Sequence, residues 1–158
     1  MRLNTLIRRI ERVRDELVPA VKAACEKEAA WIVSANKEQL AAGLNAEGVL
    51  MNGGMYSPTS RNLRTKRGLP VDHVYLSYEG DMQEGMQVEY SETGFSVVTT
   101  DWKQRLVDEV MRTGYWPSSG YNAPEYGPVF GLTAEKRGEL ARRIVPNIAR
   151  TLRRRLVG

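Results

Sequence analysis

The sequence has few of the residues that build metal centres and disulfides. Its 158 residues include a single cysteine, Cys25, and a single histidine, His73. One cysteine cannot close a disulfide within the chain, and one histidine beside it is too few for a clustered zinc site. We therefore expect no disulfide, no metal and no cofactor, and composition alone assigns no chemistry.

Long apolar runs are also missing. No stretch approaches the roughly 20 apolar residues of a membrane-spanning helix, and residues 1–4 lack the apolar core of a signal peptide. Hydrophobic residues make up 42% and charged residues 27% of the chain, which is typical of globular proteins. We expect one soluble domain over residues 1–158, made in a cytoplasm and without a membrane partner.

Charge is unevenly distributed along the chain, although the net charge is only +4. Residues 71–132 carry 3 basic and 10 acidic side chains, whereas residues 133–158 carry 8 basic and 2 acidic ones. Residues 56–70 add 4 basic side chains and no acidic one. This polarity favours contacts with further copies of the chain, or with two different neighbours, through oppositely charged surfaces.

The basic clusters make nucleic acid a competing partner. The candidates for contacts with phosphates or with an acidic partner lie in two segments: Arg61, Arg64, Lys66, Arg67, Arg150, Arg153, Arg154 and Arg155. A solvated basic face is the alternative interpretation of the same residues. No helix-turn-helix, zinc-finger or aromatic RNA-binding pattern accompanies them, so any contact with DNA should be non-specific.

Residues 1–42 are predicted to be helical. Apolar side chains recur every three or four residues from Leu3 to Ile32, which indicates a long amphipathic helix. Pro19 lacks an amide proton and disfavours helical geometry at the residue before it, so we expect a kink there or a second helix that begins at Pro19. Gly43 is the expected stop.

Two segments rich in turn-forming residues, 43–72 and 113–128, are predicted to be long loops, the first an arm. Loops of this length in a compact domain are usually functional or become ordered against a partner. We predict that aromatic residues on and beside them anchor an interface with another subunit or partner: Tyr56, Tyr115, Trp116, Tyr121, Tyr126 and Phe130. The alternative is that these rings cover the edge of the core.

A β-rich module is predicted within residues 73–132. Apolar and polar side chains alternate from Val74 onward, and again over residues 86–90 and 95–99, which a short glycine-containing turn separates. This pattern predicts a β-hairpin plus at least one further strand, followed by a helix over residues 102–111.

The last segment, residues 133–158, is predicted to be a helix with Thr133 as its N-cap. Its apolar residues recur at four-residue steps from Leu140 to Leu156, and Pro146 should kink it or require local repair. The expected fold class is therefore α+β: a long N-terminal amphipathic helix, a small antiparallel sheet with a hairpin, a C-terminal helix and two long loops.

Catalytic patterns are missing. Cys25 and His73 fall in different predicted elements, and no phosphate-binding glycine motif is present. Carboxylates at Glu79, Asp81 and Glu84 form a cluster beside two glycines, but they lack the ligand spacing of a calcium loop and more simply form a solvated turn. We predict that the protein is not an enzyme.

Three short motifs lie in the second half of the chain: Glu79-Gly80-Asp81-Met82 before the hairpin, Tyr126-Gly127 after it, and Phe130-Gly131-Leu132-Thr133 at the start of the last helix. They resemble the Thr-Gly-x-Leu-x-x-Ser signature, the aromatic-glycine step and the Phe-Leu-Gly-Leu-Ser segment of the phage virion-morphogenesis, or tail-completion, family typified by phage Mu. Similar members of this family occur in crAss-like and other Bacteroides phages. Pro128-Val129 stands where the family usually has Pro-x-Arg-Pro.

The resemblance covers residues 36–156. It implies a structural protein of a tailed-bacteriophage virion, assembled in the host cytoplasm, that forms a ring at the neck and joins the head to the tail around the DNA channel. Its partners would be further copies of the chain, other neck, portal or tail proteins, and DNA through non-specific contacts. The alternative from the residues themselves is a small basic protein that binds nucleic acid non-specifically.

Overall fold

A computed structural model describes residues 3–74, 76, 81–91, 94–101 and 126–157, with backbone alone for residues 3–6, 81 and 155–157. Its elements, in chain order, are α1 (Leu3–Lys27), α2 (Ala29–Ala41), the 3₁₀-helix η1 (Met51–Gly54), α3 (Pro58–Lys66), α4 (Asp81–Glu84), β1 (Met86–Tyr90), β2 (Phe95–Thr99) and α6 (Ala134–Val157). The predicted α+β class, with a long helix at each end and a small antiparallel sheet, is confirmed.

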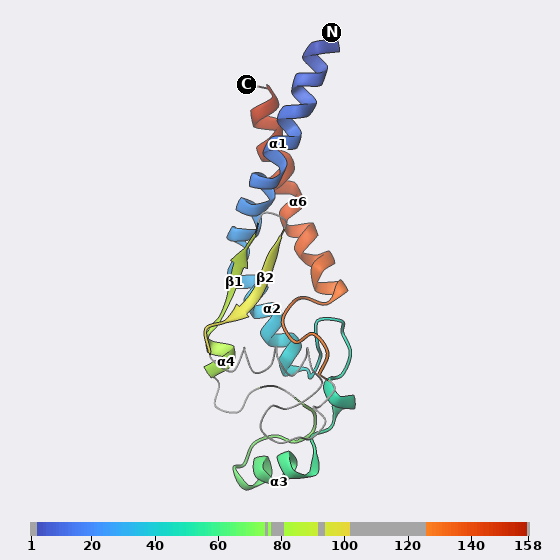
Figure 1. Cartoon of the computed structure of the whole chain (residues 1–158), viewed down its shortest axis with the longest axis vertical. Helices are drawn as coiled ribbons and strands as arrows, with labels where there is room; N and C mark the ends of the chain where they lie inside the picture. The colour runs from blue at the N-terminus through green and yellow to red at the C-terminus, as the bar shows by residue number, and fades with distance from the viewer. Residues whose placement is uncertain (1–2, 75, 77–80, 92–93, 102–125, 158) are drawn as a thin grey trace.

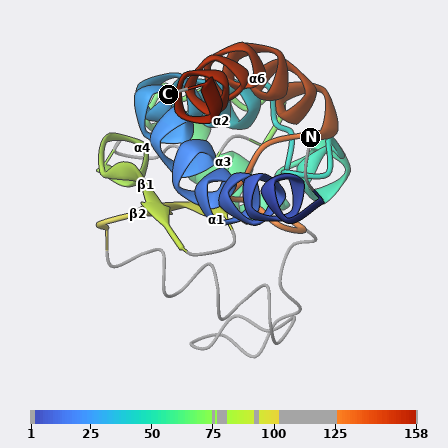
Figure 2. The same cartoon turned by 90° about the horizontal axis from the view of Figure 1, so that it is seen from above.

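The molecule is elongated because its two long helices, α1 and α6, pack side by side and run antiparallel (Figure 1). Both chain ends therefore lie at the same end of the molecule. The hairpin and α2 lie near the middle, and α3 lies at the other end (Figure 1). In the view from above, α6 lies along one edge of the molecule, and the hairpin lies on the other side of α1 (Figure 2).

Helix α1 continues through Pro19, so the predicted second helix does not begin there. The two helices of the N-terminal region are instead separated at Glu28, whose backbone leaves helical geometry (φ −99°, ψ 9°). A proline inside a helix removes one backbone hydrogen bond. Packing of α1 against α6 compensates, since most helical stability in proteins comes from such tertiary contacts.

The end of α2 confirms Gly43 as the helix stop. The amide of Gly43 donates to the carbonyl of Leu40 and that of Leu44 donates to Gln39, both at 3.0 Å. This paired arrangement needs a left-handed residue after the cap, and Gly43 has φ +75°. A Cβ at this position would lie 2.9 Å from the ring of His73, so the site also lacks space for a side chain.

The arm over residues 43–72 is not the single loop that the sequence predicted, because it contains η1 and α3. Ser57 caps α3 by accepting a hydrogen bond from the amide of Ser60 at 3.3 Å, and Pro58 occupies the first turn. A serine followed by proline is a normal helix start, so the signal was present in the sequence.

The strand predicted from His73 onward is also wrong over the described part of that segment. His73, Val74 and Leu76 lie outside any strand, although Val74 is fully buried and Leu76 is partly buried. The alternation of the sequence reflects this burial in the core. Without a strand partner to supply hydrogen bonds, an alternating pattern does not by itself make a strand.

The predicted hairpin is confirmed. Strands β1 and β2 pair antiparallel, with Val88 opposite Val97, and the amide of Ser91 donates to the carbonyl of Gly94 at 2.9 Å across the turn. The buried apolar side chains of the hairpin, Met86 and Val97, belong to the core, and the buried hydroxyl of Thr99 donates to the carbonyl of Met82 at 2.7 Å.

The core consists of two adjoining clusters on α2. One contains Leu40, Met51, Val74, Met82, Met86 and Val129, and the other contains Ile32, Ala35, Val97, Leu132 and Leu140. Phe130 packs against both clusters. Helix α2 thus links the loop side of the molecule with the hairpin and with α6.

Two buried amides of α2 fix the start of α6. Asn36 and Gln39 both donate to the carbonyl of Gly131, at 2.7 and 3.2 Å, and Gln39 accepts from the amide of Thr133 at 3.0 Å. Thr133 in turn accepts from the amide of Lys136 at 3.3 Å, which confirms it as the N-cap. Helix α6 then continues through Pro146 to Val157.

The helix predicted over residues 102–111 and most of the second predicted loop lie outside the described residues. Among the helices that are described, none combines the length and apolar character that crossing a membrane requires.

Candidate assembly surfaces

Three of the predicted interface aromatics are already used by the packing of the chain itself. Tyr56, Tyr126 and Phe130 pack against the core clusters, and burial raises the pKa of the Tyr126 hydroxyl to about 12. These rings cover the edge of the core, which was the alternative interpretation of the sequence. Tyr115, Trp116 and Tyr121 lie outside the described residues.

The basic residues around α3 divide into one structural arginine and three surface groups. Arg64 is buried, its Nε donates to the carbonyl of Pro70 at 2.9 Å, and its guanidinium lies 4.6 Å from the centre of the Tyr56 ring. Arg64 therefore holds the chain after α3 in place, and almost none of its side chain is exposed to contact a phosphate. Arg61, Lys66 and Arg67 are exposed.

The antiparallel helices bring together basic residues from the two ends of the sequence. Arg150, Arg153 and Arg154 are exposed on the last turns of α6, and Arg8, Arg9 and Arg12 are exposed on α1. Because both chain ends lie at one end of the molecule, these six arginines form one basic end (Figure 1). The side chain of Arg155 lies outside the structural description.

Large apolar side chains are exposed along the helical pair, and sequence reasoning did not identify them as surface. On α1 these are Ile7, Ile10, Leu17 and Val18, and on α6 Val145. Two helices that pack only against each other leave part of their apolar surface exposed, because the apolar stripe of such a helix is wider than the contact with one partner helix. The amphipathic period was visible in the sequence, but which part of the stripe stays uncovered was not.

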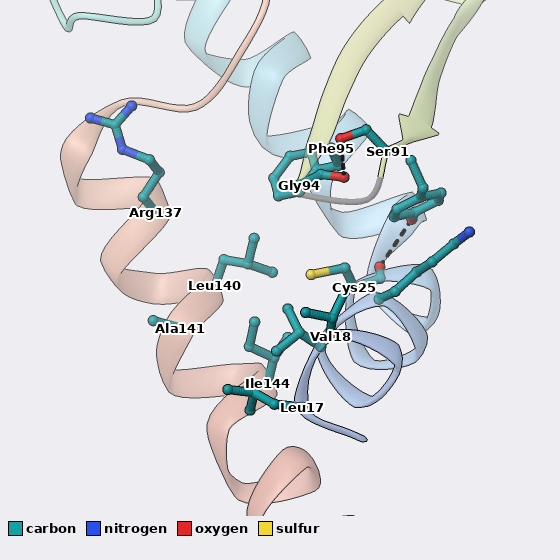
Figure 3. A pocket seen from close by; sticks show the side chains of 13 residues that line it. Leu17, Val18, Cys25, Ser91, Gly94, Phe95, Arg137, Leu140, Ala141 and Ile144 are labelled. Atoms are coloured by element: carbon teal, nitrogen blue, oxygen red, sulfur yellow. Dashed lines mark hydrogen bonds between the residues drawn. The ribbon is translucent and has the colours of Figure 1, made fainter. Parts of the chain in front are cut away.

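The exposed residues of α1 continue into an apolar groove of about 520 Å³ between α1, the hairpin and α6. Figure 3 shows Leu140 and Ile144 of α6 facing Leu17, Val18 and Cys25 of α1. Phe95 and Tyr90 close the groove on the hairpin side, and the Tyr90 hydroxyl donates to the carbonyl of Cys25 at 3.1 Å.

A second exposed apolar patch lies on the loop between α2 and α3. Val49, Leu50 and Met55 are 57%, 47% and 69% exposed, and we call residues 44–55 the projecting loop. Leu63 on the nearby α3 is exposed as well.

Hydrogen bonds hold the projecting loop in one shape. Buried Asn45 accepts from the amides of Glu47 and Val49, both at 3.0 Å, and donates to the carbonyl of Tyr126 at 3.0 Å. Leu44 and Leu50 form an antiparallel bridge. No local sequence signal indicates that Asn45 stabilises the loop, because its partner Tyr126 lies 81 residues away in the chain.

His73 fastens the segment after α3 to the end of α2. Its Nε2 lies 2.6 Å from the carbonyl oxygen of Ala41, and its Nδ1 lies 2.6 Å from a carboxylate oxygen of Asp72. Both partners are acceptors, so only the doubly protonated ring donates to both. The Ala41 carbonyl, with a further contribution from Asp72, raises the pKa of His73 above its ordinary value.

The described residues bring no catalytic or metal-binding group together. Burial raises the pKa of the Cys25 thiol, and Cys25 lines the groove whereas His73 lies at the end of α2. No set of three or more His, Cys, Asp or Glu side chains capable of holding a metal occurs in the part of the chain that the structure covers. Of the predicted carboxylate cluster, Glu84 is exposed, and the side chains of Glu79 and Asp81 are not described.

Comparison with models of protein families, with curated proteins and with solved structures finds no match to this chain. The surfaces described above therefore carry the functional argument, together with the sequence motifs.

Proposed function

We propose that the protein is a non-enzymatic structural subunit of a tailed-phage virion that assembles with copies of itself into a ring at the neck, where the head joins the tail. The motifs shared with the tail-completion family support the location. One structural observation supports assembly most strongly: the helical pair α1 and α6 exposes large apolar side chains, among them Ile10 at 60% and Val18 at 53%.

Exposed apolar side chains in a connected row are typical of surfaces that another protein covers. On α1, the exposed Ile7, Ile10 and Leu17 recur at helical spacing, and Leu17 and Val18 also line the apolar groove. Covering it would remove apolar surface from water and stabilise the assembly, at about 25 cal/mol per Å².

The proposal is tested by measuring the mass of the purified protein, alone and mixed with its neck, portal and tail neighbours, and by locating it in a virion reconstruction. We expect a closed ring of copies between head and tail. A protein that stays monomeric at every concentration and is missing from the particle would rule the proposal out.

The basic end favours a second candidate, non-specific binding of nucleic acid. Six exposed arginines belong to the start of α1 and the last turns of α6, two segments more than a hundred residues apart whose backbones lie at this end of the molecule. A phosphate backbone is attracted to such a cluster without reading sequence.

Salt dependence separates the two candidates. If the basic end binds duplex DNA, its affinity should fall steeply as the salt concentration rises. In a plot of the logarithm of the binding constant against the logarithm of the salt concentration, the steepness of the slope should decrease by about 0.9 for each phosphate contact removed. The variant Arg150→Gln, Arg153→Gln, Arg154→Gln should flatten that slope, whereas the control Arg61→Gln, Lys66→Gln, Arg67→Gln on α3 should not. Self-assembly through apolar surface should change little over the same salt range.

A further inference from the structure

The apolar groove has the size and chemistry of a site for apolar side chains. Its volume of about 520 Å³ is within the range of protein binding pockets, about 300 to 1,000 Å³. The charged residues among those that line it, Lys22 and Arg137, are both basic. Leu17 and Val18 line the groove and are also exposed, so it is open to a partner along α1.

The projecting loop has the complementary properties. It presents Val49, Leu50 and Met55 to solvent, and the bonds of Asn45 hold it rigid, so little conformational entropy is lost when it is bound. Glu47 is the single charged residue of the segment 44–55.

The projecting loop borders an acidic hollow at the end of α2 and the start of α6, and the basic residues of α3 do not line it. Glu47 lines this hollow together with Glu38, Glu135 and Lys136, which gives three carboxylates and one ammonium, a net charge of −2. The two cations beside the groove give +2. The loop side and the groove side therefore attract each other, whereas two grooves or two loops repel.

We infer that the projecting loop of one copy of this chain inserts Val49, Leu50 and Met55 into the apolar groove between α1, the hairpin and α6 of a second copy. The inference rests on the proposed function, because it names the contact through which the subunit joins its neighbour. The groove and the loop have no residue in common, so the contact is heterologous. Repeating such a contact closes a ring when the rotation between copies completes a full turn, and otherwise builds an open filament.

Mixing two complementary variants tests this contact. The loop variant Val49→Asp, Met55→Asp and the groove variant Val18→Asp change exposed side chains, so each should fold as the wild type does, which circular dichroism and thermal unfolding verify. Each variant alone should lose self-association by about 10-fold or more. In an equimolar mixture, one intact groove meets one intact loop, and we expect a dimer that grows no further.

A matched control places the same aspartate outside the two surfaces. Leu63→Asp on α3 replaces a side chain that is 51% exposed, close to the 53% of Val18, and that neither belongs to the projecting loop nor lines the groove. This control should assemble as the wild type does. Glu47→Arg and Arg137→Glu should each weaken assembly, and combining the two reversals in one chain should restore part of it.

The outcomes separate this inference from the proposed function. A wild type that forms oligomers while the loop and groove variants assemble equally well leaves the proposed function standing and overturns the loop-in-groove contact. Complementary variants that stay monomeric in the mixture overturn it too, because a heterologous contact requires rescue. A wild type that never self-associates, with or without its neighbours, overturns both.

Discussion

The body of the molecule around α2 and the helical pair of α1 and α6 differ in how far they bury their side chains. In the body, Ile32 and Leu40 are fully buried and the polar groups of Gln39 bond to distant backbone. In the helical pair, no described residue of α1 before Ala24 and none of α6 after Leu140 is buried. The body therefore encloses a core around α2 and exposes large apolar side chains on the projecting loop and α3, whereas most of the described helical pair keeps its apolar side chains in contact with water.

This difference indicates that the two regions have different roles. Packing in the body stabilises the fold of the single chain, because burial of apolar surface is the main favourable contribution to folding. The helical pair gains less from burial within the chain, and its uncovered side chains gain more from contact with a neighbour. The regions can be distinguished by substitutions that change the same kind of side chain in each.

The largest effect is expected from shortening a side chain of the body. Ile32→Ala should lower the free energy of unfolding by about 2 to 5 kcal/mol, since it removes buried methyl groups and leaves a cavity. Leu17→Ala on the helical pair should lower the free energy of unfolding by less than about 1.5 kcal/mol. Leu17 is 42% exposed, so folding of the single chain removes only part of its side chain from water. Urea unfolding of the isolated chain measures both. Equal losses would contradict the contrast between the two regions.

An intermediate effect is expected at the glycine that ends α2. Gly43→Ala should cost about 1 to 2 kcal/mol for the left-handed backbone and more for the contact of the new Cβ with His73. Gly53→Ala is the matched control, because Gly53 has φ +61° but no atom within 4 Å of its Cβ position. The difference between the two free energies of unfolding then measures the close approach of the His73 ring and the Val74 carbonyl to the end of α2. No difference would mean that both groups move away freely.

The smallest effect is expected from titrating His73. Its pKa in the folded chain is raised above the ordinary value of 6.5, so its stabilising contribution is fully present below that value. It is lost as the pH rises through the folded pKa. We expect the urea midpoint of the wild type to fall over this interval relative to that of His73→Gln, which lacks the titration. Parallel pH profiles for the two proteins would contradict a charged bond between His73 and Ala41.

Much of the local structure was predictable because its signals lie within a few residues of one another. The apolar period of α1 and α6, the N-cap at Thr133, the stop at Gly43 and the alternation on both sides of the hairpin turn all depend on neighbours in sequence. The cap of α3 belongs to the same class, and was overlooked because turn-forming residues surround Ser57 and Pro58.

The candidate surfaces were predictable only in part. The basic segments were visible as charge counts, yet Arg64 looks no different in sequence from Arg61, and its burial depends on Tyr56 and Pro70. The aromatic residues near the loops were predicted to anchor an interface, and the structure shows that Tyr56, Tyr126 and Phe130 pack against the core of their own chain. The apolar groove combines three distant segments and has no sequence signature.

The amino-acid sequence by itself determined which segments become helices and the hairpin and how much charge each carries, because these properties depend on interactions between residues a few positions apart. Only the tertiary structure decided that α1 and α6 run antiparallel, so that the start of α1 and the last turns of α6 lie at one end of the molecule, and that a groove stays open between the helices and the hairpin. Those outcomes depend on how the whole chain buries its apolar surface, which no single segment specifies.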